Sequence, residues 1–244
     1  MKSTLKILVL FSGLCLLTGI VSVAQPTVIG SFDIGDNNAA ESYFIKSNAI
    51  GQYRFGKNMA EAGFLMNLKN TGENFIPGYR LMASRDFTIR EFPFAVRAFL
   101  MQTTDADMLR ETNWGFDVSK EWKHIDLVLG TYFKTYAYRN EAIETYGIEE
   151  DAAKMKEPFN FLYSFTYHLK PTGNPWNVGL TVTNFDYFLY NQETNPLFNV
   201  NGTYKLNESI ELFAQAWCET SGIFNINATY FGYYFRTGIK WNIK

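Results

Sequence analysis

The residues best suited to acid–base chemistry are two histidines, His124 and His168, and a carboxylate near the first of them, Asp126. A lipid hydrolase would need a histidine paired with a serine nucleophile, and a metal site would need a third well-placed ligand. The sequence has no phosphate-cradling glycine loop, paired-cysteine metal motif or Gly-x-Ser-x-Gly elbow. We therefore predict a protein that is not an enzyme, with no catalytic residues, no metal and no cofactor.

The composition excludes several other classes of protein. The chain has 244 residues, of which 47% are hydrophobic and 17% aromatic, with a net charge of −2 and two cysteines. This apolar content is too high for a disordered chain, and without a basic excess the chain is not expected to bind a nucleic acid polymer. Two cysteines, one of them in an N-terminal apolar segment, do not make a disulfide scaffold.

The N-terminus has the pattern of a secretory signal. Lys2 and Lys6 precede an apolar run that ends in Ser22-Val23-Ala24, which predicts a signal peptide over residues 1–24 with cleavage after Ala24. Leu14 before Cys15 argues against a lipoprotein signal. Beyond residue 24, no apolar stretch approaches the ~20 residues of a membrane-spanning helix. An exported chain of this kind would cross a membrane only as a β-barrel.

Residues 25–244 show alternation between apolar and polar positions, which indicates β-strands. It is clearest over 229–243, where Phe231, Tyr233, Phe235 and Ile239 alternate with residues that include Arg236 and Lys240. The same period predicts twelve strands, near 27–35, 43–55, 58–68, 74–85, 92–102, 111–121, 124–137, 157–169, 176–187, 196–205, 209–219 and 229–243. The fold class is therefore all-β, a transmembrane antiparallel up-and-down barrel formed by one domain.

The lengths of the connections support a location in the outer membrane. Short turns, such as 55–58 and 205–208, alternate with longer polar links, as in outer-membrane barrels. The longest link, 139–157, carries six acidic residues and is expected to be an external loop. A soluble sandwich or lipocalin-like barrel with an inward apolar face is the alternative, but the strands are longer than the soluble norm.

The inward parity of these strands combines charges of both signs with aromatic rings. Such a surface suits a flat polar solute, whose ring can stack while its edges form hydrogen bonds. The alternative is that the aromatic residues plug a structural barrel. The predicted lining residues are Arg54, Arg80, Arg97, Phe99, Asp117, Tyr132, Lys134, Phe185, Phe213, Trp217, Tyr234 and Arg236. His124 and His168 share this parity near short turns, where a satisfied polar contact beside Asp126 is favoured over a metal or proton site.

The segment from Glu157 to Asp186 resembles the nucleoside-specific channel-forming Tsx porins and the Tsx-like small outer-membrane barrels of Bacteroidota. It contains an aromatic strand, 161–167, a turn with Pro171, and the ending Thr183-Asn184-Phe185-Asp186. Residues 113–117 and the closing strand 232–238 are also similar, whereas the terminal Trp241-Asn242-Ile243-Lys244 departs from the family's aromatic end. The resemblance implies a monomeric twelve-stranded barrel with a narrow pore that passes nucleosides. Within this resemblance, Phe185 and Asp186 are the residues that match the family's motif.

We therefore predict a narrow passive channel for small polar solutes such as nucleosides, located in the cell outer membrane. Its expected partners are outer-membrane lipid, the solute, and the barrel-assembly machinery during biogenesis; the chain is expected to be a monomer. Two other interpretations remain. One is a closed structural or surface-interaction barrel whose acidic loop 139–157 binds a partner, and the less favoured one is an outer-membrane lipid hydrolase.

Overall fold

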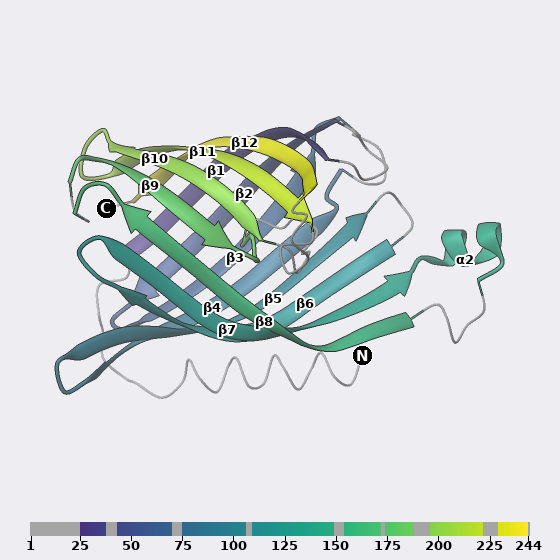
Figure 1. Cartoon of the computed structure of the whole chain (residues 1–244), viewed down its shortest axis with the longest axis horizontal. Coiled ribbons are helices and arrows are strands. Elements are labelled where there is room, and N and C mark those ends of the chain that lie inside the picture. The colour runs from purple at the N-terminus through teal and green to yellow at the C-terminus, as the bar shows by residue number, and fades with distance from the viewer. Residues whose placement is uncertain are drawn as a thin grey trace.

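Twelve antiparallel strands close into a single barrel in the computed structural model (Figure 1). The structure describes residues 25–37, 43–69, 75–105, 109–148, 154–171, 174–187, 196–221 and 229–243, so the predicted signal peptide lies outside it. The strands are β1 (Gln25–Asn37), β2 (Phe44–Phe55), β3 (Asn58–Asn67), β4 (Gly78–Ile89), β5 (Phe92–Asp105), β6 (Leu109–Glu121), β7 (Ile125–Tyr138), β8 (Lys154–His168), β9 (Trp176–Thr183), β10 (Leu197–Lys205), β11 (Ile210–Ser221) and β12 (Thr229–Asn242).

Each strand pairs with the next along the chain, and the first pairs with the last. Eleven residue pairs join β1 to β12, from Thr27 opposite Asn242 to Asn37 opposite Gly232. This closure leaves no open edge, as a sheet in a bilayer requires, because lipid offers no partner to backbone N–H and C=O groups. The predicted twelve-stranded up-and-down barrel is confirmed.

The apolar side chains of the strands point outward. On β12, Phe235 and Trp241 are about half exposed (54% and 50%), whereas Tyr234 and Arg236 are each 1% exposed. A soluble barrel would place these faces the other way round, because a continuous exposed apolar surface is unfavourable in water. The alternative of an inward apolar face is therefore wrong, and the outer surface suits hydrocarbon.

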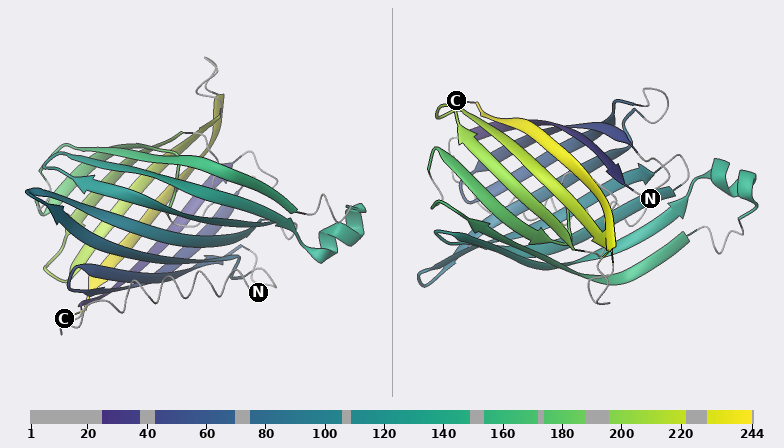
Figure 2. Two further views of the ribbon diagram at one scale, coloured as in Figure 1. Left: turned by 90° about the horizontal axis from the view of Figure 1, so that it is seen from below. Right: turned by 45° about the horizontal axis from the view of Figure 1, so that its top comes forward.

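The connections differ between the two ends of the barrel. Tight turns occupy the end that holds the described chain ends near Gln25 and Asn242, among them Gly56 with φ of 58°. At the opposite end, β7 and β8 extend toward a short helix, α2 (Asn140–Tyr146), which projects away from the barrel (Figures 1 and 2). The predicted loop 139–157 therefore needs correction, because part of it is helical and β8 already begins at Lys154.

Helix α2 ends at Gly147, whose left-handed backbone (φ 61°) lets its N–H donate to the carbonyl of Ile143. Among the described residues, no helix is long and apolar enough to span a membrane.

Candidate functional site

The chain leaves the barrel wall after Thr183, four residues before the predicted end of that strand. The Thr183 hydroxyl donates to the carbonyl of Tyr163 on β8 (2.8 Å). The side-chain amide of Asn184 accepts from the N–H of Tyr163 (2.9 Å) and donates to the carbonyl of Phe161 (2.7 Å). These side chains occupy ladder positions that a longer strand would fill with its backbone. The prediction of a strand over 176–187 is thus wrong at its end, and residues 184–187 turn into the lumen.

Phe185 fills an aromatic cage inside the barrel. Its ring centroid lies 5.0 Å from that of Phe99 on β5, 4.9 Å from that of Tyr132 on β7 and 5.0 Å from that of Tyr187. The contacts with both tyrosines are edge-on, an arrangement that aromatic quadrupoles favour. Phe185 is 1% exposed. A residue expected to line an open channel is therefore packed in the interior of the barrel.

Asp186, the next residue, forms a two-bonded ion pair with Arg236 on β12. The Nη2 and Nη1 groups of Arg236 donate to the two carboxylate oxygens at 2.8 and 3.2 Å. The Tyr234 hydroxyl donates to the same carboxylate at 2.9 Å. Charge-assisted bonds in this fork geometry are among the stronger polar interactions in proteins. Three donors therefore converge on one carboxylate.

A second carboxylate fixes Arg236 from the barrel wall. Arg236 Nε donates to Asp33 on β1 (2.6 Å), and Asn48 on β2 donates to the other oxygen of Asp33 (2.7 Å). The Trp217 and Tyr234 rings stack 5.4 Å apart, and the guanidinium carbon lies 5.8 and 5.4 Å from their centroids. The orientation of Arg236 is thus set by strands β1, β11 and β12 as well as by Asp186.

Tyr187 joins the same segment to the opposite side of the lumen. Its hydroxyl donates to Asp117 on β6 (2.8 Å) and accepts from Arg97 on β5 (3.3 Å). Arg97 also donates to Asp117 through Nε (2.7 Å), and its guanidinium lies 4.8 Å from the centre of the Tyr187 ring. Residues 184–187 therefore bridge β12 on one side and β5–β6 on the other. We call them the plug segment.

Two further ion pairs face the lumen. Arg80 on β4 pairs with Glu61 on β3, and Lys134 on β7 lies 3.9 Å from Glu111 on β6. All four side chains are nearly fully buried. Buried charges are tolerated only when they are paired and hydrogen-bonded. Each of these two cations therefore has a carboxylate beside it.

Most of the predicted lining residues belong to one layer of ion pairs and aromatic rings inside the barrel. The buried ones are Arg80, Phe99, Asp117, Tyr132, Lys134, Phe185, Trp217, Tyr234 and Arg236, and the side chain of Arg97 is 21% exposed. Phe213 is partly exposed, and its ring lies where a Cβ on Gly238 would be. Arg54 differs, because it is half exposed at the turn end and pairs with Asp86 (2.9 Å). Arg54 therefore lies outside the constricted layer.

Sequence reasoning missed Asp33 and Tyr187. Asp33 alternates with the exposed Phe32 and Ile34 on β1, so its inward parity could be read from the sequence. Tyr187 was assigned to the end of a strand, and no sequence pattern indicated that it crosses the lumen.

The lumen is constricted at the level of the plug segment. Asp33, Asp117 and Tyr132 have no exposed surface, although all three face the interior of the barrel. The described residues therefore form a constriction made of ion pairs and aromatic rings.

The two histidines lie at the turn end, as their strand positions predicted. His168 Nε2 lies 2.7 Å from Asp126, and its Nδ1 lies 3.1 Å from the amide of Asn177. His124 Nδ1 lies 3.0 Å from the carbonyl of His168. Both ring nitrogens of His168 are thus engaged by groups other than a serine. Within the part of the chain that the structure describes, no three His, Cys, Asp or Glu residues are grouped to hold a metal.

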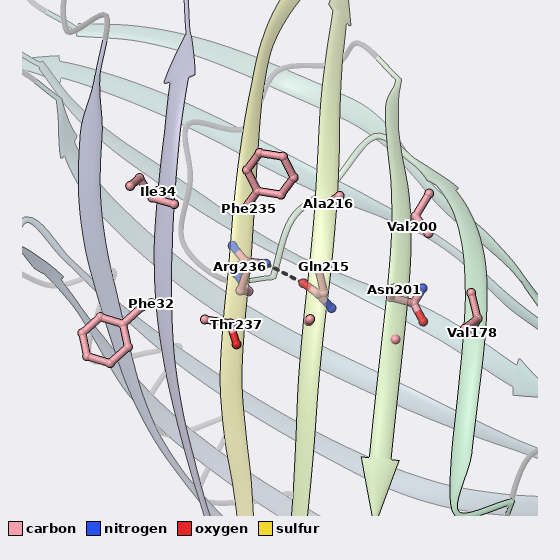
Figure 3. Close-up of a pocket in the computed structure, with 12 residues that line it drawn as sticks. Phe32, Ile34, Val178, Val200, Asn201, Gln215, Ala216, Phe235, Arg236 and Thr237 are labelled. Carbon is pink, nitrogen blue, oxygen red and sulfur yellow. Dashed lines mark hydrogen bonds between the residues drawn. The ribbon is translucent and has the colours of Figure 1, made fainter.

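A separate depression of about 400 Å³ lies on the outer face of β9–β12 and β1 (Figure 3). It lies over the small residues Gly202, Ala214 and Ala216 and is bordered by Phe32 and Phe235. Arg236, seen beneath it with its bond to Gln215 (3.3 Å), points to the other side of the sheet (Figure 3). This apolar depression faces the surface that suits lipid.

Comparison with known proteins identifies the fold. No family model matches the sequence, and no curated protein matches it. The KdgM porin in complex with disordered oligogalacturonate superimposes with a TM-score of 0.54 at 9% identity, covering 89% of this chain and 99% of that one. A second structure of the KdgM porin gives 0.53 at 8% identity, with the same coverage. Omp33 of Acinetobacter baumannii gives 0.47 at 10% identity, covering 90% of this chain and 98% of that one. The barrel therefore has the fold of a small outer-membrane porin.

Proposed function

We propose that this protein is an outer-membrane channel for small polar solutes, with nucleosides as the leading candidates. The observation that carries the proposal is the layer of ion pairs and aromatic rings inside a barrel whose outer surface is apolar. Ionised groups within a bilayer are costly unless they are paired or line a polar path. A barrel that served only as a scaffold could fill the same space with aliphatic side chains at lower cost.

The pairing of the charges argues against a polyanionic solute. Arg80, Arg97 and Arg236 each contact a carboxylate, so their positive charges are already compensated. The ligand named for the KdgM porin is oligogalacturonate. A polyanion of that kind would need unpaired cations along its path, whereas these three arginines are already paired. Nucleosides combine a flat ring with several hydrogen-bonding groups and suit the neighbouring rings of Phe99, Tyr132 and Trp217.

The test is single-channel conductance of the refolded mature chain in a planar lipid bilayer, measured with and without uridine or adenosine. Ribose, which lacks the base, serves as the control solute. Discrete steps that nucleosides block and ribose does not would support the proposal. Steps blocked equally by all three would retain the channel but remove nucleoside selectivity. A folded, heat-modifiable barrel that gives no steps would overturn the channel.

A second candidate function is supported by the constriction itself. If the plug segment never leaves the lumen, the barrel is a closed scaffold that presents α2 and its neighbouring residues outside the membrane. Deletion of 140–146 would then abolish attachment to a partner while the bilayer remained impermeable. The geometry of His168, whose two ring nitrogens are already engaged, gives no support to lipid hydrolysis.

A further inference from the structure

We propose that Arg236 and Tyr234 form a carboxylate-binding site in the lumen that the chain's own Asp186 occupies in this structure. A solute that carries a carboxylate and a flat ring enters by taking the places of Asp186 and Phe185. This inference rests on the proposed channel, and it names one class of solute and the step that admits it.

The binding groups are oriented without help from the plug segment. Asp33 accepts from Arg236 Nε, and Asn48 in turn donates to Asp33, so the guanidinium keeps one edge against β1. Its other edge, with Nη1 and Nη2, points at Asp186 together with the Tyr234 hydroxyl. Tyr234 is stacked on Trp217. The three donors therefore converge on one point because of residues in regular strands, and they would keep that geometry if Asp186 moved away.

Asp186, which occupies the site, is attached to the barrel wall less firmly than Arg236 and Tyr234, which form the site. Asp186 lies three residues beyond the end of β9, in a segment with no strand ladder of its own. The ladder between β8 and β9 has five residue pairs, whereas that between β6 and β7 has thirteen. Movement of residues 185–187 would break side-chain contacts and leave the barrel ladder intact.

The donors select the chemistry of the solute. A guanidinium edge with two parallel N–H groups matches the two oxygens of a carboxylate, and a buried donor left without an acceptor costs about 1–3 kcal/mol. Arg80 lies near enough to interact electrostatically with both Asp186 and Arg236. Three arginines (Arg80, Arg97, Arg236) and four carboxylates (Asp33, Glu61, Asp117, Asp186) surround this point. A monocarboxylate that replaces Asp186 keeps this count, whereas a neutral solute leaves three arginines and three carboxylates and offers no carboxylate to the two N–H groups of Arg236.

The cage around Phe185 adds the second requirement. The rings of Phe99 and Tyr132 contact the Phe185 ring, and Phe185 directly precedes Asp186 in the chain. The plug segment therefore places an aromatic ring and a carboxylate in neighbouring sites. A solute with both groups on a short flexible linker can fill both. We choose 3-phenylpropionate as the probe, with its neutral amide and propionate as controls that lack the charge and the ring.

Trp217 provides a direct signal for binding. It stacks on Tyr234 and is 8% exposed, whereas Trp114, Trp122, Trp176 and Trp241 are 39% to 50% exposed. The experiment titrates each probe into the refolded mature chain in detergent and follows tryptophan fluorescence. Trp217→Phe identifies the part of the signal that comes from the lumen. We expect saturable binding of 3-phenylpropionate and weaker binding of both controls.

Asp186→Asn is the decisive variant, because it removes the internal competitor's charge at nearly constant shape. If the competitor occupies the site nine-tenths of the time or more, its loss lowers the apparent Kd for 3-phenylpropionate at least ~10-fold. Asp86→Asn, which alters the carboxylate that pairs with Arg54 at the turn end, outside the constricted layer, should keep the wild-type Kd. Arg236→Gln should abolish the response to the charged probe.

The proposal is overturned if Asp186→Asn leaves the Kd unchanged, or if the neutral amide binds as tightly as the acid. Both results can be read even if Arg236→Gln does not fold. Conductance recorded on the same preparations separates this inference from the proposed channel. If the barrel conducts but does not bind the charged probe selectively, only the carboxylate-site hypothesis is contradicted. If it binds the probe selectively but never conducts, only the channel hypothesis is contradicted.

Discussion

Arg236 and Asp186 form a two-bonded ion pair across the lumen, with the carboxylate side chain 2% exposed and the guanidinium fully buried. The two residues are 50 positions apart and belong to different parts of the fold, a wall strand and a segment that has left the wall. Their contact joins the plug segment to the far side of the barrel. We therefore expect the lumen to open when this pair is broken.

Asp186→Asn should raise the ionic conductance of the barrel and its permeability to small neutral solutes such as ribose. Loss of a charge-assisted interaction worth about 1.5–3 kcal/mol raises the fraction of open barrels about tenfold or more, provided the plug segment is mostly closed in the wild type. Planar-bilayer recordings measure the ionic conductance and liposome swelling measures ribose entry, with Asp86→Asn at the exposed turn end as the control. Equal conductance of both variants and the wild type would show that the ion pair does not hold the lumen closed.

Asp33→Asn should destabilise the barrel itself more than Asp186→Asn does. Asp33 links β12 to β1 through Arg236 and accepts from Asn48 on β2, so its loss leaves a buried guanidinium poorly compensated within the wall. Removal of one partner of a buried ion pair costs about 3–5 kcal/mol. Urea unfolding in lipid vesicles, followed by tryptophan fluorescence, compares the two variants. The reverse order of stability would contradict the separate roles assigned to wall and plug.

Phe185→Ala should open a passage without comparable damage to the barrel. A phenylalanine truncated in a rigid core costs about 3–5 kcal/mol. The ring of Phe185 belongs to a segment outside the strands, so we expect a smaller loss of unfolding free energy together with faster ribose entry into liposomes. Leu162→Ala, which truncates a fully buried residue of β8 beside the same cluster, is the comparison. A larger destabilisation by Phe185→Ala than by Leu162→Ala would mean that the plug segment is part of the folding core.

Replacement of residues 140–146 by a short Gly-Ser linker should leave conductance and heat-modifiability unchanged. Helix α2 projects from the barrel, beyond the ends of β7 and β8 (Figure 2). Single-channel recording of the shortened chain tests this expectation. An altered step size would show that the helix contributes to the channel entrance. It would then no longer be the separate partner-binding element that the closed-scaffold hypothesis requires.

The strands could be predicted because the alternation of apolar and polar residues is a local pattern, and the lipid around the barrel requires it. Alternation places an apolar side chain outward at every second residue, and this pattern located all twelve strands with small errors at most ends. The end of β9 could not be located in this way, because Thr183 and Asn184 replace backbone partners of β8 with side-chain hydrogen bonds. Residues 184–187 alternate polar and aromatic side chains as a strand would, but they leave the barrel wall and enter the lumen.

Parity also predicted which side chains face inward, but not which of them meet. Arg236 and Arg54 have the same inward parity, yet one is fully buried between two carboxylates and the other is half exposed at the turn end. The difference depends on height along the barrel and on the path of the plug segment. Tyr187 shows the same limit, since its contact with Asp117 spans 70 positions.

The short ladder between β8 and β9 has a mechanical meaning as well. A ring of strands under load yields at the joint with the fewest bonds, and here that joint lies beside residues 184–187. Amide hydrogen exchange should begin there before it reaches β6 and β7. A force applied to the segments outside the barrel would break the ladder between β8 and β9 first. Unfolding of the wall and movement of the plug segment out of the lumen would therefore start at the same place.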